Sequence, residues 1–89
     1  MRVDQLLNKL CLIKTRSIAK KAADKNLIKI NGKIANASSN VLAGDLIEYE
    51  LYGYYNKLKI VEVPKGNVSK VSAPTFYEFS EREKLESNT

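Results

Sequence analysis

Residues 27–34 read Leu-Ile-Lys-Ile-Asn-Gly-Lys-Ile, and this stretch marks the point where the spacing of apolar residues changes. Before it, apolar residues recur at helical spacing, whereas from Leu27 onward they alternate with polar ones. Asn31-Gly32 separates the two alternating runs, and both residues tolerate the positive φ that a tight hairpin turn requires. The stretch therefore predicts a β-hairpin that follows helical structure, and with it an α+β fold.

Two short helices are predicted before the hairpin. Asp4 is expected to cap the first, and Thr15 to cap a second that runs from about residue 16 to residue 25. Asn26 can adopt the left-handed conformation that ends the second helix. The apolar face of the first helix consists of Leu6, Leu7, Leu10 and Cys11. That of the second consists of Ile18, Ala19, Ala22 and Ala23.

Two longer strands are predicted after the hairpin. Gly44-Asp45 forms a turn into a strand over residues 46–51, and Tyr54-Tyr55-Asn56 turns the chain into a second strand over residues 57–63. Pro64 then closes a small antiparallel sheet. The expected fold is two N-terminal helices packed on this curved sheet.

The remaining residues, 65–89, change in character and are predicted to be a C-terminal extension to a domain of residues 1–64. Phe76, Tyr77 and Phe79 suggest an aromatic segment that docks as cover for a small core. The charged run Glu81-Arg82-Glu83-Lys84 suggests a short or fraying helical end. The extension is therefore expected to be partly ordered or helical.

Composition excludes several classes of chemistry. A chain of 89 residues forms one small domain, and this one has no histidine and a single cysteine, Cys11. Zinc sites, disulfide frameworks and histidine-based catalysis therefore lack their usual groups. Cys11 is expected to be a small buried hydrophobe rather than a redox residue. No apolar run approaches the roughly 20 residues of a membrane span, so we expect a cytoplasmic protein. Because the usual catalytic groups are missing, we also expect that it is not an enzyme and needs no cofactor.

The net charge of +5 is unevenly distributed along the chain. Residues 1–44 contain nine Lys and Arg residues against two acids, a balance of +7, whereas residues 45–89 contain six against eight, a balance of −2. A basic balance confined to one half is typical of a polyanion-binding surface.

Helix geometry gathers the cations of the second helix on one side. At about 100° per residue, Arg16 and three lysines occupy its polar half. These lysines are Lys20, Lys21 and Lys25. Arg16 and Lys14 flank the helix start, where free backbone amides favour a phosphate. The alternative is that these lysines only solvate an exposed helix face. Base stacking by tyrosines is not expected, because core packing or an exposed strand face is favoured for Tyr49, Tyr52, Tyr54 and Tyr55.

The ordered set of motifs resembles the S-four, or alpha-L, RNA-binding domain. These motifs are Arg2-Val3-Asp4-x-x-Leu7, Lys14-Thr15-Arg16-x-x-Ala19, Ile30-Asn31-Gly32 and Gly44-Asp45-x-Ile47. The resemblance covers residues 2 to about 51. The whole chain is similar to stand-alone bacterial proteins of the RqcP type, which are related to the heat-shock-induced ribosome-recycling S-four protein. Residues 12–20, 30–39 and the tail from Phe76 to Leu85 carry this closer likeness.

The resemblance implies an alpha-L fold that binds RNA on its helical face. It also implies binding to large ribosomal (50S) subunits obstructed by a nascent chain, with contacts to rRNA and to tRNA or peptidyl-tRNA. Such proteins support C-terminal tailing by an RqcH-type partner. Two alternatives are a heat-shock-type recycling factor that binds large subunits carrying a nascent chain without a role in tailing, and an accessory module of an RNA-modifying enzyme. We expect a monomer with no membrane partner.

Arg2 and Arg16 match the family's arginines and are the leading RNA contacts. The full set of predicted RNA-binding residues is Arg2, Lys14, Thr15, Arg16, Lys20, Lys21, Lys25, Asn31 and Lys33. The chain departs from the family pattern between the helices, where many S-four domains have a glycine and this chain has residues 11–13. Thr15 stands where a serine or a second basic residue is common, and Lys21 where an acid is common.

Overall fold

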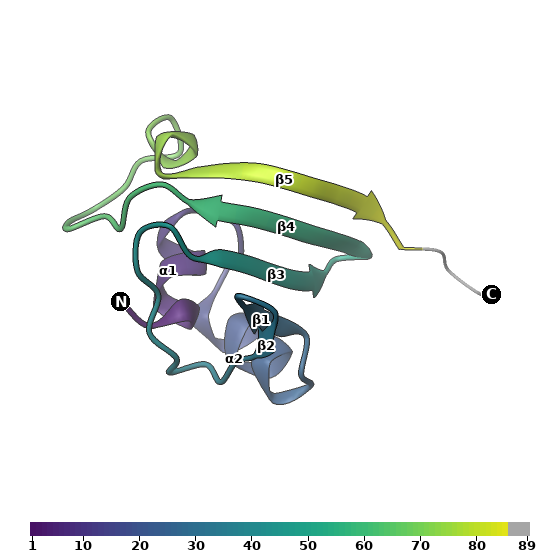
Figure 1. Cartoon of the computed structure of the whole chain (residues 1–89). Helices are drawn as coiled ribbons and strands as arrows, with labels where there is room; N and C mark the ends of the chain where they lie inside the picture. The colour runs from purple at the N-terminus through teal and green to yellow at the C-terminus, as the bar shows by residue number, and fades with distance from the viewer. Residues whose placement is uncertain (86–89) are drawn as a thin grey trace.

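The computed structural model describes residues 1–85, which fold into two helices and one sheet (Figure 1). The elements are α1 (Val3–Lys9), α2 (Arg16–Asp24), β1 (Ile28–Ile30), β2 (Lys33–Ile34), β3 (Leu46–Leu51), β4 (Tyr54–Ile60), the 3-10 helix η1 (Ala73–Phe76) and β5 (Tyr77–Lys84). The five strands pair in the order β2-β1-β3-β4-β5, and all neighbours are antiparallel. The predicted α+β class is confirmed.

The helices pack on one face of the sheet and enclose the core between the two layers (Figure 1). Helical spacing puts Leu6, Leu7 and Leu10 on the buried side of the first helical segment. The strands contribute inward-facing residues that are also fully buried, namely Ile28, Ile47, Leu58 and Ile60. The described chain measures 41 × 24 × 22 Å, and the far end of β5 extends beyond the helices (Figure 1).

Capping and turn residues correctly predicted most element boundaries in the first half of the chain. Thr15 caps α2, since its Oγ1 accepts a hydrogen bond from the Ile18 amide at 3.2 Å. Asn26 ends the helical segment with φ of 60°, and the hairpin turn has φ of 51° at Asn31 and 82° at Gly32. The hairpin predicted over residues 27–34 is confirmed, with its first strand beginning at Ile28.

Two predictions for the first helix are wrong. Asp4 is not the cap, because the N-cap residue is Arg2 and makes no side-chain cap bond. The Asp4 carboxylate lies inside the first turn and accepts from the Gln5 amide at 2.7 Å. Cys11 is exposed rather than buried, because the chain leaves α1 there with φ of 61° and turns the side chain outward. A glycine at this position would adopt the left-handed backbone without strain.

The turn between the long strands lies earlier than predicted. Tyr52 and Gly53 make it, with φ of 54° and 78°, and β4 already begins at Tyr54. The strand ends at Ile60, three positions before the expected limit. The register pairs Leu51 with Tyr54, which puts the Tyr54 ring on the same face as the helices.

The predicted helical end over residues 81–84 is wrong, because these residues belong to β5. The strand pairs with the full length of β4, from Ile60 opposite Tyr77 to Tyr54 opposite Lys84, with one irregularity beside Lys57 and Leu58. This pairing satisfies the backbone groups of β4 that would otherwise form an open edge. Residues 86–89 of the predicted extension lie outside the described residues. The division at residue 64 stays a prediction, since pairing within a sheet does not show whether residues 1–64 fold alone.

The sheet face away from the helices is rich in acids. The strand register places five glutamates on it, namely Glu48, Glu50, Glu78, Glu81 and Glu83. Three lysines share this outer face, namely Lys29, Lys57 and Lys59. The acidic second half of the sequence thus lies largely on the side opposite the helices.

Candidate nucleic-acid interface

A buried carboxylate joins the two arginines that the sequence singled out. The Asp4 side chain is 4% exposed and receives Arg2 Nη2 at 3.1 Å and Arg2 Nε at 3.2 Å. Arg16 Nη2 lies 3.5 Å from the same Oδ2 atom. The two arginine side chains are about half exposed, at 49% and 50%. Asp4 therefore orients two guanidinium groups whose outer edges remain open to solvent.

Three separate segments build this arrangement. Arg2 precedes α1, and its backbone pairs with Asn40 in the loop before β3, while the Val3 amide donates to Ser39 O at 2.8 Å. Arg16 opens α2, and the Thr15 cap fixes where that helix begins. Packing of α1 against α2 then brings the two arginines to one carboxylate.

The predicted lysines extend this basic surface without internal neutralisation. Within the described part of the chain, both ion pairs end on Asp4. Four exposed lysines near or on α2 are therefore left without an acidic partner there, namely Lys14, Lys20, Lys21 and Lys25. Unpaired cations at this density favour a polyanion, because no carboxylate has to be displaced before a phosphate can bind.

The three remaining predicted contacts differ in how free their side chains are to bind RNA. Asn31 uses its side chain internally, since Nδ2 donates to Asp45 Oδ1 at 3.1 Å and Oδ1 accepts from the Leu46 amide at 3.0 Å. Lys33 is exposed on β2, one of the two edge strands of the sheet. Thr15 commits its oxygen to the cap of α2. Of these three predicted contacts, Lys33 therefore offers the freest side chain.

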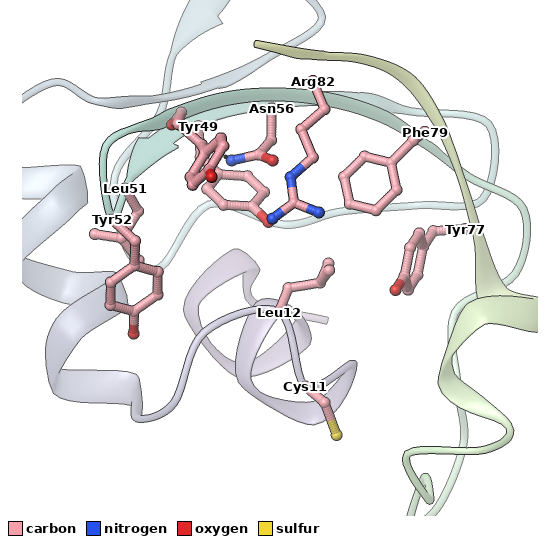
Figure 2. A pocket seen from close by; sticks show the side chains of 10 residues that line it. Cys11, Leu12, Tyr49, Leu51, Tyr52, Asn56, Tyr77, Phe79 and Arg82 are labelled. Carbon is pink, nitrogen blue, oxygen red and sulfur yellow. Dashed lines mark hydrogen bonds between the residues drawn. The ribbon is translucent and has the colours of Figure 1, made fainter. Parts of the chain in front are cut away.

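Sequence reasoning missed an aromatic cleft beside this surface. A cavity of about 300 Å³ lies between the loop after α1 and the inner face of β3, β4 and β5 (Figure 2). Tyr49, Tyr77 and Phe79 point into it, together with Arg82 (Figure 2), and Tyr54 also lines it. Burial raises the pKa of Tyr49 to about 12, so its phenol stays protonated at neutral pH. The alternation of Tyr77 and Phe79 was the one signal that could have revealed this face.

Among residues 1–85, His, Cys, Asp and Glu side chains nowhere gather in a group of three or more that could hold a metal ion. Neither helix in this range has the length and apolar character needed to cross a membrane.

The fold and the paired arginines define an RNA-binding class of domain. The family model described as the S4 domain matches residues 1–47, more than half of the chain, and the chain belongs to the S4 domain family. Relatives named RQC P-site tRNA stabilizing factor match over nearly the full length. The Streptococcus pneumoniae protein is 36% identical over 99% of both chains, and the Bacillus subtilis protein is 39% identical over 96% of this chain and 98% of its own. The predicted resemblance to S-four domains and to stand-alone RqcP-type factors is confirmed.

Solved structures share the same fold. Heat Shock Protein 15 of Vibrio cholerae superimposes with a TM-score of 0.82 at 22% identity, over 90% of this chain and 81% of that one. A hypothetical protein solved in solution gives a TM-score of 0.78 at 27% identity, over 93% of this chain and all of its own. The predicted alpha-L architecture is confirmed.

Proposed function

We propose that this protein is an RNA-binding factor of the large ribosomal subunit. It holds P-site tRNA on subunits obstructed by a nascent chain and so supports C-terminal tailing in ribosome-associated quality control. Its partners are large-subunit rRNA, tRNA or peptidyl-tRNA, and an RqcH-type tailing factor. Full-length relatives named RQC P-site tRNA stabilizing factor support this role. The observation that carries it in this chain is the pair of half-exposed arginines on Asp4, inside the S4-matched segment.

The mechanism is occupancy rather than catalysis. Arginine's planar fork can hold a phosphate with two hydrogen bonds, and Asp4 fixes the direction of two such forks. The lysines of α2 add mobile point charges along the RNA backbone. Recognition therefore depends mainly on the spacing of phosphates and the shape of the RNA. The phosphate contacts are Arg2, Lys14, Arg16, Lys20 and Lys21.

Binding to large subunits at several salt concentrations tests this function. If about five phosphates are neutralised, log affinity falls against log salt with a slope of roughly −3.5 to −4.5. Arg16→Ala should weaken binding about tenfold or more and make the slope shallower by about one. Lys59→Ala, on the outer face of β4, removes the same charge and should bind like the natural chain. Association that is nearly independent of salt, or equal binding by Arg16→Ala, would reject RNA binding by this surface.

The alternative function is a heat-shock-type recycling factor without a role in tailing. Its support is the fold shared with Heat Shock Protein 15, at 22% identity. Pull-down of the natural chain, with sequencing of bound tRNA and detection of tailed nascent chains, separates the two roles. Recovery of peptidyl-tRNA and tailed chains supports the quality-control role, whereas subunits whose nascent chains are never tailed support recycling.

A further inference from the structure

The aromatic cleft has a cation at its centre. Arg82 Cζ lies 4.9 Å from the centroid of the Tyr54 ring and 6.0 Å from that of Phe79. Its neighbours Glu81 and Glu83 face the opposite side of the sheet, because side chains alternate along β5. Within residues 1–85 no carboxylate pairs with Arg82. The guanidinium is thus held by rings and is open to an anion.

The cleft also offers surfaces suited to a planar ring. Tyr77 and Phe79 meet edge to face, with centroids 5.3 Å apart. Phe79 is 43% exposed, so part of its ring is open to solvent. Asn56 is buried on the same inner face, and its amide makes only a long 3.5 Å bond to Tyr54 O. Aromatic faces and an underused amide are the groups that proteins use to bind an unstacked base.

The cleft is continuous with the proposed phosphate-binding surface. The Tyr52 hydroxyl at its rim accepts a hydrogen bond from the Lys14 amide at 3.5 Å. Cys11 lines both this cleft and an adjoining hollow that Lys9 and Arg16 also line. An RNA strand that crosses Arg16 therefore passes the mouth of the cleft.

We infer that the cleft binds one unstacked nucleotide of the RNA whose backbone lies across Arg2 and Arg16. The base stacks among Tyr54, Tyr77 and Phe79, the Asn56 amide bonds to its edge, and Arg82 pairs with its phosphate. The inference rests on the proposed RNA-binding function and names the part of the RNA that reaches the inner face of the sheet. A volume of about 300 Å³ is at the low end for ligand sites, which are roughly 300 to 1,000 Å³, and so suits a single nucleotide.

Charge and polarity favour RNA over a peptide segment as the occupant. The cleft contains a cation and no acidic side chain among its lining residues, and its interior includes a polar amide. An apolar peptide would bury Arg82 and Asn56 without partners, which costs binding free energy. A nucleotide satisfies both groups and uses the rings as well.

Ultraviolet crosslinking of the natural full-length chain to purified large subunits tests the site directly. After irradiation at 254 nm and ribonuclease digestion, mass spectrometry should find nucleotide adducts on Tyr54, Tyr77 or Phe79. Adducts confined to residues of the α2 surface, with none on the cleft rings, would overturn the inference. So would cleft residues that crosslink only to a nascent peptide when a photoreactive phenylalanine replaces Phe79.

Two exposed-residue variants separate the parts of the site. Phe79→Leu should weaken subunit binding about fivefold with an unchanged salt slope, since base stacking contributes little salt dependence. Arg82→Gln should weaken binding and make the slope shallower by about one. Lys59→Gln on the outer face is the matched control and should have no effect. Circular dichroism of each variant confirms folding.

These results distinguish failure of the site from failure of the proposed function. If both cleft variants bind like the natural chain while Arg16→Ala is weakened, the nucleotide site is wrong and RNA binding by α2 stands. If Arg16→Ala and the cleft variants all bind like the natural chain, the proposed function itself fails.

Discussion

Arg2 precedes α1 and Arg16 begins α2, yet both guanidinium groups converge on Oδ2 of Asp4, at 3.1 Å and 3.5 Å. One buried anion between two half-exposed cations leaves a net positive charge at a fixed place. Because Asp4 is 4% exposed, its geometry is set by packing rather than by solvent. Asp4 is thus a positioning residue for both arginines.

Asp4→Asn should loosen the two arginines without changing the shape of the site. The amide can still accept from the Gln5 backbone but loses the charge-assisted bonds from Arg2 and the ion pair with Arg16. We expect the free energy of unfolding to fall by about 1–2 kcal/mol and binding to large subunits to weaken several-fold at physiological salt. Chemical denaturation and subunit binding measure the two effects. Binding equal to that of the natural chain would show that the arginines need no such orientation.

Cys11→Gly should stabilise the fold. Cys11 adopts φ of 61° and is exposed, so glycine relieves the left-handed strain and removes few contacts. The gain should be about 0.5–1 kcal/mol, which corresponds to a few degrees in the melting temperature of a domain this size. Cys11→Ser keeps the strain and is the control. Equal melting temperatures for the glycine and serine variants would contradict the assignment.

Stability should decline at alkaline pH because of the buried tyrosines. Burial raises the pKa of Tyr49 to about 12. The pKa of Tyr77 is also raised, mainly by burial and to a smaller extent by the nearby Cys11. The folded state therefore keeps phenol protons that the unfolded chain releases near pH 10. This contribution is fully present below about pH 10 and is lost as the pH rises toward 12. Thermal melts between pH 8 and 12 measure it, with Tyr49→Phe expected to show a smaller decline than the natural chain.

A chain shortened to residues 1–64 tests the proposed division of the protein. It lacks β5 and the side chains of Val68, Phe76 and Tyr77 that pack against the core. We expect it to retain α1, α2 and the hairpin but to lose more than about 2 kcal/mol of unfolding free energy, because burial of each large apolar side chain contributes roughly 1.5–3 kcal/mol. Amide NMR spectra and denaturation check both points. An unfolded fragment would reject the division at residue 64.

The parts of the fold that could be predicted from the sequence are those determined by interactions between residues close together in the chain. Thr15 bonds to an amide three residues away, and Asn31-Gly32 makes its own turn, so sequence reading placed both. Residues 81–84 have no such local signal. Their charges suit a helix end, but in the structure they pair with β4. This pairing depends on the edge that β4 leaves open, not on the sequence of residues 81–84 alone.

In the candidate site too, some features could be predicted from the sequence and others depend on tertiary packing. Arg2 and Arg16 could be named from motif and charge, whereas their common dependence on Asp4 arises from packing of α1 against α2. The tyrosines were expected to be core or surface residues of separate strands. The early turn at Tyr52 and Gly53 and the pairing of β5 bring Tyr49 and Tyr54 into one cleft with Arg82.

The glutamates on the outer face of the sheet have a consequence for how the protein meets its target. With cations on α2 and a surplus of acids on the outer face of the sheet, the described part of the molecule has an electric dipole across its thickness. In the field of a ribosomal surface such a dipole experiences a torque, which turns the helices forward before contact. Encounters that begin in the wrong orientation are thereby corrected during approach, and the rate of productive association should exceed that of a chain with the same net charge spread evenly.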